Sequence, residues 1–168
     1  RVGAQANSAQ GALGSSAQGL EVFQPFFVDI DLPAQLTVGD EIGLPVVVYN
    51  YLEEAQEVDL QLEIDGPLEL RSQARQTLRL GAGEVRGVYY TIAATSVGTA
   101  QLTIQGQAGD EADAVQRSLR IAPNGDAVEQ TVGGRAEGPD NNITTLFPVD
   151  AVPDANELMI KLYPGYAT

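Results

Sequence analysis

Acidic side chains are the groups in this sequence whose spacing could support chemistry. Three sets stand out: Asp29 with Asp31, Asp40 with Glu41, and Asp110 with Glu111 and Asp113. On a β-strand, Asp29 and Asp31 point to the same face, and carboxylate oxygens are the ligands that Ca²⁺ prefers. The spacing does not match an EF-hand loop, however, and a solvated acidic face is the simpler interpretation. We assign no metal site.

Other catalytic chemistry is limited by the absence of His and Cys from the sequence. A Ser-His-Asp triad, a thiol nucleophile and a Cys/His zinc site are therefore excluded within this chain. Residues 81–85 (GAGEV) read as a turn, because the Lys-Ser/Thr pair of a phosphate loop is missing. Two carboxylates for glycoside hydrolysis would need a cleft between them. We expect no catalytic or ligand-binding residues, no cofactor and no enzymatic activity.

Aromatic residues are the second candidate for function. The set comprises Phe23, Phe26, Phe27, Tyr49, Tyr51, Tyr89 and Tyr90. Packing in the core or between domains is a more common role for such a set than a ligand platform. Phe23 and Phe27 fall on the strand face opposite Phe26, and large exposed aromatic side chains usually mark a contact surface. We therefore expect Phe27 to pack against a neighbouring domain.

Composition narrows the range of partners and locations. The formal net charge of −14 over 168 residues argues against binding to nucleic acid or anionic membranes, and it suits a secreted or periplasmic protein. No apolar run approaches the ~20 residues that span a bilayer. The absence of Cys leaves the redox compartment open. Because the chain starts at Arg1, without Met or a signal-like segment, we interpret it as a fragment of a longer protein.

The elements that would position these side chains are short β-strands. Val58, Leu60 and Leu62 alternate with acidic or amide residues, a period of two that predicts a strand with one apolar face. Similar runs predict strands at 26–32, 41–50, 57–64, 68–70, 76–80, 84–94, 99–105 and 114–122, with the strand at 41–50 central and covered on both faces. Turn signals separate them at intervals of roughly 8–12 residues. Residues 20–123 are thus predicted to form an all-β, antiparallel sandwich of the immunoglobulin or fibronectin type III kind.

The two flanks have a different character. Residues 1–19 are rich in Ala, Gly, Gln and Ser, which predicts a flexible linker. Residues 124–168 predict a small, incomplete β region with strands at 127–132 and 158–162, which would be marginal alone in water. Asn142 begins a possible glycosylation sequon. Arg117 lies on the core side of its predicted strand, which indicates a sheet edge or a bulge at that position.

Several stretches also carry a family resemblance. FQPFFVDIDLP at 23–33, TVGDEIGLPVVVYNYL at 37–52 and VDLQLEI at 58–64 occur in an order that resembles the alpha-2-macroglobulin and complement family. Residues 120–125 and 151–155 are similar to later junctions of that family. Gln35, Leu36 and Val38 depart from its usual pattern. The absence of Cys, against the disulfides of vertebrate members, suggests a bacterial relative.

The resemblance implies a role for each segment. Residues 20–123 would be the macroglobulin-type domain, and 124–168 the first part of a CUB domain that leads to a thioester domain outside this chain. The parent would be an extracellular or periplasmic endopeptidase inhibitor. This chain would support the thioester domain and its protease-triggered rearrangement, and its partners would be the thioester domain, the remaining CUB strands and, through the parent protein, target proteases.

An independent binding module is the alternative. A secreted immunoglobulin-like adhesion domain that recognises a protein or a glycan would show the same strand pattern. Sequencing the gene past Thr168 would separate the two hypotheses. A Cys-x-Glu-Gln motif followed by a helical domain supports the inhibitor, whereas a stop codon or further sandwich repeats support the adhesion module.

Overall fold

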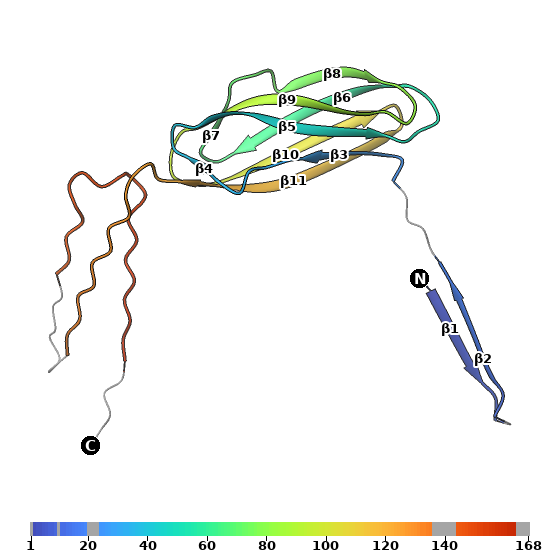
Figure 1. Cartoon of the computed structure of the whole chain (residues 1–168), viewed down its shortest axis with the longest axis horizontal. Coiled ribbons are helices and arrows are strands. Elements are labelled where there is room, and N and C mark those ends of the chain that lie inside the picture. The colour runs from blue at the N-terminus through green and yellow to red at the C-terminus, as the bar shows by residue number, and fades with distance from the viewer. Residues whose placement is uncertain (1, 10, 20–23, 136–143, 164–168) are drawn as a thin grey trace.

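The central part of the chain folds into two β-sheets that pack face to face. A computed structural model describes residues 2–9, 11–19, 24–135 and 144–163, and every regular element within them is a strand (Figure 1). The sandwich strands are β3 (Phe26–Ile30), β4 (Leu36–Thr37), β5 (Glu41–Asn50), β6 (Gln56–Asp65), β7 (Leu68–Leu70), β8 (Arg75–Leu80), β9 (Val85–Ala94), β10 (Gly98–Ala108) and β11 (Glu111–Ala122). The all-β sandwich predicted from the two-residue periodicity is confirmed.

The two sheets are built from non-consecutive strands. One has the order β4-β11-β10-β6-β8 and the other β3-β5-β9-β7. The pairings are antiparallel, except that the short β4 runs parallel to β11 at Leu36 and Thr37. The chain therefore changes sheets between β3 and β4. This arrangement places β3, an edge strand of its sheet, beside β11, which β4 covers only at Ile121 and Ala122.

The core consists of the inward-facing residues of both sheets. Alternate positions on β5, β6 and β10 are fully buried, as the periodicity predicts: Leu44, Val46, Val48, Val58, Leu60, Leu62, Ala100, Leu102 and Ile104 are at most 2% exposed. Gly106 of β10 also faces this core, where an added Cβ would lie 2.6 Å from Val28 Cγ1. Because core packing leaves few voids, this position admits glycine and no larger side chain without displacement of β3.

The buried side-chain amide of Asn50 links two loops at one end of the sandwich by hydrogen bonds. Asn50 is the one buried polar residue of the described core. Its Nδ2 donates to the carbonyl oxygens of Gly81, at 2.8 Å, and Glu54, at 3.1 Å, and its Oδ1 accepts from the N–H of Leu52 at 3.2 Å. The side chain thus joins the β5–β6 loop to the β8–β9 turn.

The N-terminal flank differs from its prediction. The expectation of a flexible linker over residues 1–19 does not hold for the described part, in which β1 (Val2–Asn7) and β2 (Leu13–Gln18) pair as an antiparallel hairpin. Gly11, with φ of 84°, closes its turn. Sequence composition missed this element because a hairpin ladder uses only main-chain groups and requires no side-chain burial; the described side chains of the hairpin are exposed.

The C-terminal flank also differs from its prediction. Residues 124–135 and 144–163 contain no strand, so the strands expected at 127–132 and 158–162 are absent. The alternating apolar residues there, among them Leu158, Ile160 and Leu162, are 57–90% exposed. A strand needs a partner to satisfy its main-chain groups, and the described residues offer none to this segment. No helix in the described ranges is long and apolar enough to cross a bilayer. Asn142 lies outside the described residues.

Candidate functional site: an aromatic sheet face

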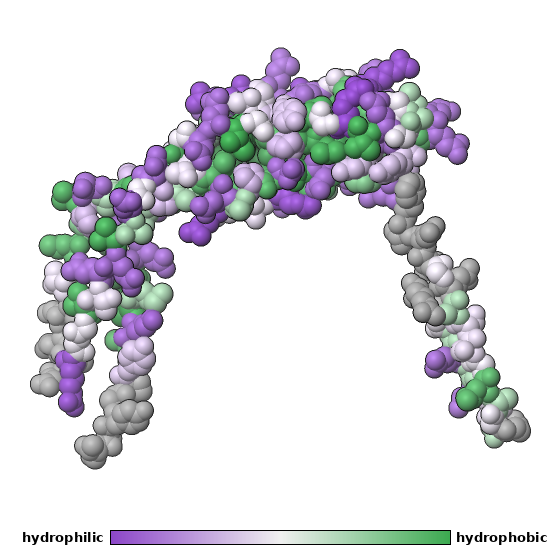
Figure 2. Space-filling view, viewed as in Figure 1, coloured by the Kyte–Doolittle hydropathy of each residue, from purple (hydrophilic) through white to green (hydrophobic). Residues whose placement is uncertain are grey.

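The outward face of the sheet β3-β5-β9-β7 carries a group of aromatic and apolar side chains, with Asp29 of β3 beside Val47 of β5. The strand register aligns Phe27 with Tyr49 and Tyr49 with Val85 in one row across three strands. Pro45 pairs with Tyr89 in another row, with Val47 between the two on β5. We call this surface the aromatic face and define it by Phe27, Pro45, Val47, Tyr49, Tyr51, Val85 and Tyr89. Figure 2 shows hydrophobic side chains on the visible side of the sandwich, bordered by hydrophilic ones.

Three rings form the centre of this face. The rings of Phe27 and Tyr49 stack with centroids 4.2 Å apart and planes 14° from parallel. The ring of Tyr51 lies 5.9 Å from Phe27 and 6.2 Å from Tyr49. Aromatic contacts of this kind stabilise by about 0.5–1.5 kcal/mol beyond area burial. Stacking leaves Phe27 and Tyr49 half-buried, whereas Tyr51, Val85 and Tyr89 remain 43%, 46% and 67% exposed.

The prediction for β5 is confirmed only in part. This strand is central in its sheet, with β3 on one side and β9 on the other. Its outward residues Pro45, Val47 and Tyr49 are half-buried, and in the described part of the chain no element lies across them. The apolar character of both strand faces, which led to the expectation of cover on both sides, therefore corresponds to one covered face and one open face. Phe23, the other aromatic residue predicted to face a neighbouring domain, lies outside the described residues.

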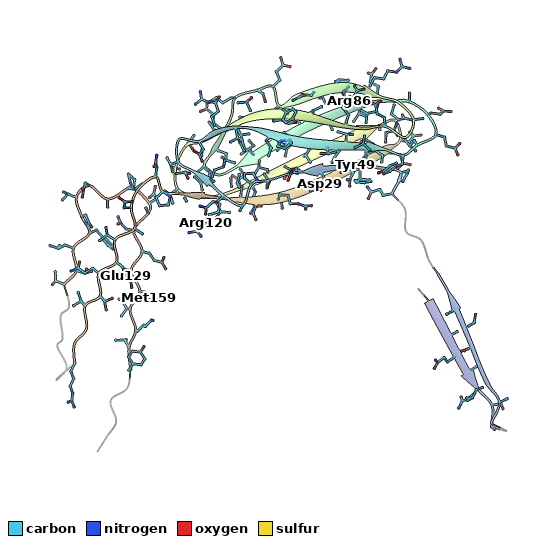
Figure 3. The ribbon with its side chains drawn as sticks, viewed as in Figure 1. Asp29, Tyr49, Arg86, Arg120, Glu129 and Met159 are labelled. Atoms are coloured by element: carbon cyan, nitrogen blue, oxygen red, sulfur yellow. The ribbon has the colours of Figure 1, made fainter. Side chains whose placement is uncertain are left out.

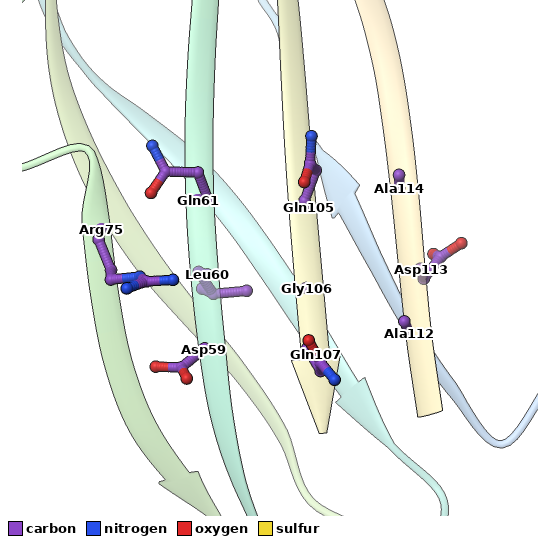
Figure 4. Close-up of a pocket in the computed structure, with 10 residues that line it drawn as sticks. All are labelled: Asp59, Leu60, Gln61, Arg75, Gln105, Gly106, Gln107, Ala112, Asp113 and Ala114. Atoms are coloured by element: carbon purple, nitrogen blue, oxygen red, sulfur yellow. The ribbon is translucent and has the colours of Figure 1, made fainter. Parts of the chain in front are cut away.

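The outward face of the opposite sheet is polar. A shallow hollow crosses it from β8 to β11, lined mainly by Asp59, Gln61, Arg75, Gln105 and Gln107, with the small side chains of Ala112 and Ala114 at one end (Figure 4). Asp59 accepts a hydrogen bond from Thr77 Oγ1 at 2.6 Å. These are solvated amides and charges without a nucleophile–base pair. The two outer surfaces of the sandwich thus differ in kind, and only the aromatic face has the chemistry of a contact surface.

The predicted acidic sets are dispersed by the fold. Asp40 accepts from the N–H of Thr37 in the β4–β5 turn, at 2.7 Å. Asp110 and Glu111 lie at the β10–β11 turn. Within the described ranges, no three Asp or Glu side chains converge as metal ligands would.

Asp29 and Asp113, from different sets, are used at the junction between the two sheets. Asp113 Oδ2 accepts from the N–H of Val28 at 3.0 Å, and Asp29 Oδ1 accepts from the N–H of Ile30 at 2.9 Å. Arg117 Nη2 reaches Asp29 Oδ1 at 3.1 Å. The uninterrupted register of β10 and β11 shows no bulge at Arg117, so the edge position predicted for it is confirmed. Sequence reasoning missed this pairing of β3 with β11 because the partners are 85 and 88 residues apart.

The turn predicted at residues 81–85 is confirmed. Glu84 N donates to the carbonyl oxygen of Gly81, and Glu84 Oε2 accepts from the N–H of Gly81 at 2.6 Å. That main-chain hydrogen bond, and then the hydrogen bond from Arg86, lower the pKa of the Glu84 carboxyl below its usual value. The carboxylate is therefore a turn-closing group and does not have the raised pKa of a general acid.

Similarity to known proteins agrees with this architecture. The family model described as "Alpha-2-macroglobulin family" matches residues 1–62. A mouse relative, alpha-2-macroglobulin-like protein 1, is 28% identical over 116 residues, which are 67% of this chain and 7% of that protein.

Solved structures show the same fold. The native conformation of Escherichia coli alpha-2-macroglobulin matches with a TM-score of 0.61 and 21% identity, over 72% of this chain and 8% of that one. Salmonella alpha-2-macroglobulin reacted with methylamine gives a TM-score of 0.61 and 24% identity over the same shares. A native E. coli structure that spans domain MG7 to the C-terminus gives 0.53 and 22%, over 59% of this chain and 17% of that one. The chain thus spans under a tenth of the length of the mouse relative and of the first two structures.

Proposed function

We propose that the chain is a non-catalytic structural segment of a larger protease inhibitor of the alpha-2-macroglobulin family, to which residues 1–62 and the sandwich fold are similar. Its role is to support the thioester domain of that protein and the rearrangement that a protease triggers. The observation that carries the proposal is the aromatic face, an open apolar surface on a sandwich whose other outer surface is polar. The absence of His and Cys from the sequence also supports a structural rather than a catalytic role.

The domain limits follow from the same proposal. Residues 20–123 are the macroglobulin-type domain, and 124–168 begin a CUB domain completed by chain from elsewhere in the parent. Leu146, Val149 and Ile160 support this division, because they are 81%, 106% and 72% exposed and have the apolar character of residues that need cover. Figure 3 shows the segment with Glu129 and Met159 as extended chain beyond the sandwich. The parent is extracellular or periplasmic.

The proposal is tested by Phe27→Ser in the parent protein and in the 168-residue chain. In the chain alone the substitution removes the stack on Tyr49, the contact with Tyr51 and the burial of half a ring, so the free energy of unfolding should fall by about 1–3 kcal/mol. In the parent it should also loosen domain docking, seen as faster limited proteolysis between domains and weaker inhibition of a protease acting on a large substrate.

Gln101→Ser is the matched control, because Gln101 is exposed on the polar sheet. It should change neither measurement. Equal effects of Phe27→Ser and Gln101→Ser on docking and inhibition would contradict the proposal. The alternative function, an independent adhesion module, would be favoured instead if the parent carried further sandwich repeats and no inhibitory activity.

A further inference from the structure

The margin of the aromatic face is acidic. Asp31 follows β3, and its N–H donates to the carbonyl oxygen of Pro45, so it lies beside the apolar row at 3.1 Å from that oxygen. Glu41 begins β5 on the same outward side as Pro45, and Glu53 follows Tyr51 in the next loop. These three carboxylates are exposed. The apolar surface therefore has negative charge at its edge strand and at both ends of β5.

These three carboxylates form no ion pair with a residue of the described chain. The three ion pairs found there, Arg71–Glu69, Arg86–Glu84 and Arg117–Asp29, leave out the carboxylates of Asp31, Glu41 and Glu53.

The sandwich arginines outside these ion pairs lie on the opposite sheet. Arg75 and Arg79 are exposed on β8, and Arg120, which Figure 3 labels, is exposed on β11. The outer surface of the polar sheet carries these arginines together with exposed acids such as Glu57, Glu63 and Asp65. The three acids at the margin of the aromatic face, in contrast, have no arginine partner among the ion pairs of the described residues.

We propose that the aromatic face docks a surface of a neighbouring domain of the parent protein that is apolar at its centre and carries Lys and Arg at its margin. The inference rests on the proposed function and adds the chemistry of the partner. Opposite charges at an interface margin steer association and select the partner. A second copy of this chain is disfavoured, because two acidic margins would face each other and the whole chain carries −14.

The test compares hydroxyl-radical oxidation of Tyr89 in the parent protein and in the 168-residue chain, at low and high salt. The variant is the triple reversal Asp31→Lys, Glu41→Lys and Glu53→Lys. Because these side chains are exposed, the isolated chain should keep its thermal stability, which circular dichroism checks. Glu57→Lys, Glu63→Lys and Asp65→Lys, made together on β6 of the polar sheet, are the control with the same change in net charge.

Tyr89 should oxidise several-fold more slowly in the parent than in the isolated chain. The reversal at Asp31, Glu41 and Glu53 should remove most of that protection, and raised salt should weaken protection in the unmodified parent because exposed charges are screened. The β6 control should leave protection unchanged.

Each other outcome has a distinct meaning. Protection that is insensitive to both the triple reversal and salt, but lost in Phe27→Ser, would overturn the inferred basic partner and leave the proposed function standing. Equal oxidation of Tyr89 in the parent and the isolated chain would overturn both. A dimeric isolated chain in which Tyr89 is protected would assign the face to a second copy and overturn the inference.

Discussion

Tyr90 provides a test of the packing described for the core. Its side chain is 0% exposed on the inward face of β9, and its hydroxyl has no hydrogen-bond partner among the described residues. A buried hydroxyl without a partner costs about 1–3 kcal/mol, and its removal by Tyr90→Phe leaves a gap smaller than a methyl group. At neutral pH we therefore expect the variant to be between unchanged and about 2 kcal/mol more stable than the wild type.

The same hydroxyl makes stability depend on alkaline pH. Burial raises the pKa of Tyr90 from 10.0 to about 12. Between these values the unfolded chain has released the proton while the folded chain still holds it, so the unfolded state binds fewer protons and stability falls as pH rises. Near pH 11 the loss is about 1.4 kcal/mol, and above about pH 12 it approaches roughly 3 kcal/mol.

Urea unfolding of the 168-residue chain, followed by far-ultraviolet circular dichroism from neutral pH to about pH 11, measures both effects. The difference between wild type and Tyr90→Phe isolates this one group from all others that titrate. Tyr89→Phe is the matched control, because Tyr89 is the adjacent residue and is 67% exposed, so its hydroxyl is solvated in both states. At neutral pH this control should leave the free energy of unfolding unchanged.

Two results would refute this reasoning about Tyr90. A loss of more than about 1 kcal/mol at neutral pH would mean that the hydroxyl makes a hydrogen bond in solution. Parallel pH profiles for the wild type and Tyr90→Phe would mean that the phenol ionises as easily in the folded chain as in the unfolded one.

Three further substitutions test other contacts by the same urea assay. Gly106→Ala places a Cβ 2.6 Å from Val28 Cγ1 and should lower the free energy of unfolding by about 1–3 kcal/mol. Gly87→Ala is its control and should lower it little, because the added Cβ meets no atom within 4 Å. Equal losses in the two variants would contradict the close approach at Gly106. Asn50→Ala removes three hydrogen bonds inside the sandwich and should cost about 2–3 kcal/mol, and a neutral result would show that water replaces them. Asp113→Ala frees the Val28 N–H and should cost about 1 kcal/mol; an increase in stability would mean that the carboxylate is strained there.

The sandwich could be predicted from the sequence because its signals are local. The two-residue period of β5, β6 and β10 identifies their buried faces directly. Gly39, Gly66, Gly83, Gly98 and Gly109 mark turns by residue type, and in the structure each has a positive φ. Both kinds of signal act within a few residues, so they need no knowledge of which strand pairs with which.

What the sequence could not supply depends on distant pairing. The aromatic face exists because β3, β5 and β9 align Phe27, Tyr49 and Val85 in one row, and this register becomes known only with the fold. Apolar alternation predicted a strand at 158–162 that the structure does not form, since periodicity reports a preference and not the presence of a partner. The hairpin of β1 and β2 shows the opposite case, in which main-chain pairing occurs without a side-chain pattern.

The carboxylates at the outer edge of β3 have a consequence for how this protein behaves in concentrated solution. An exposed strand edge is a template on which another chain can assemble. The N–H groups of Val28 and Ile30 already donate hydrogen bonds to the carboxylates of Asp113 and Asp29. An incoming strand would have to displace a charged acceptor from each of these two N–H groups before it could pair with β3. The chain therefore carries its own protection against fibril growth at this edge, and that protection persists when neighbouring domains move away.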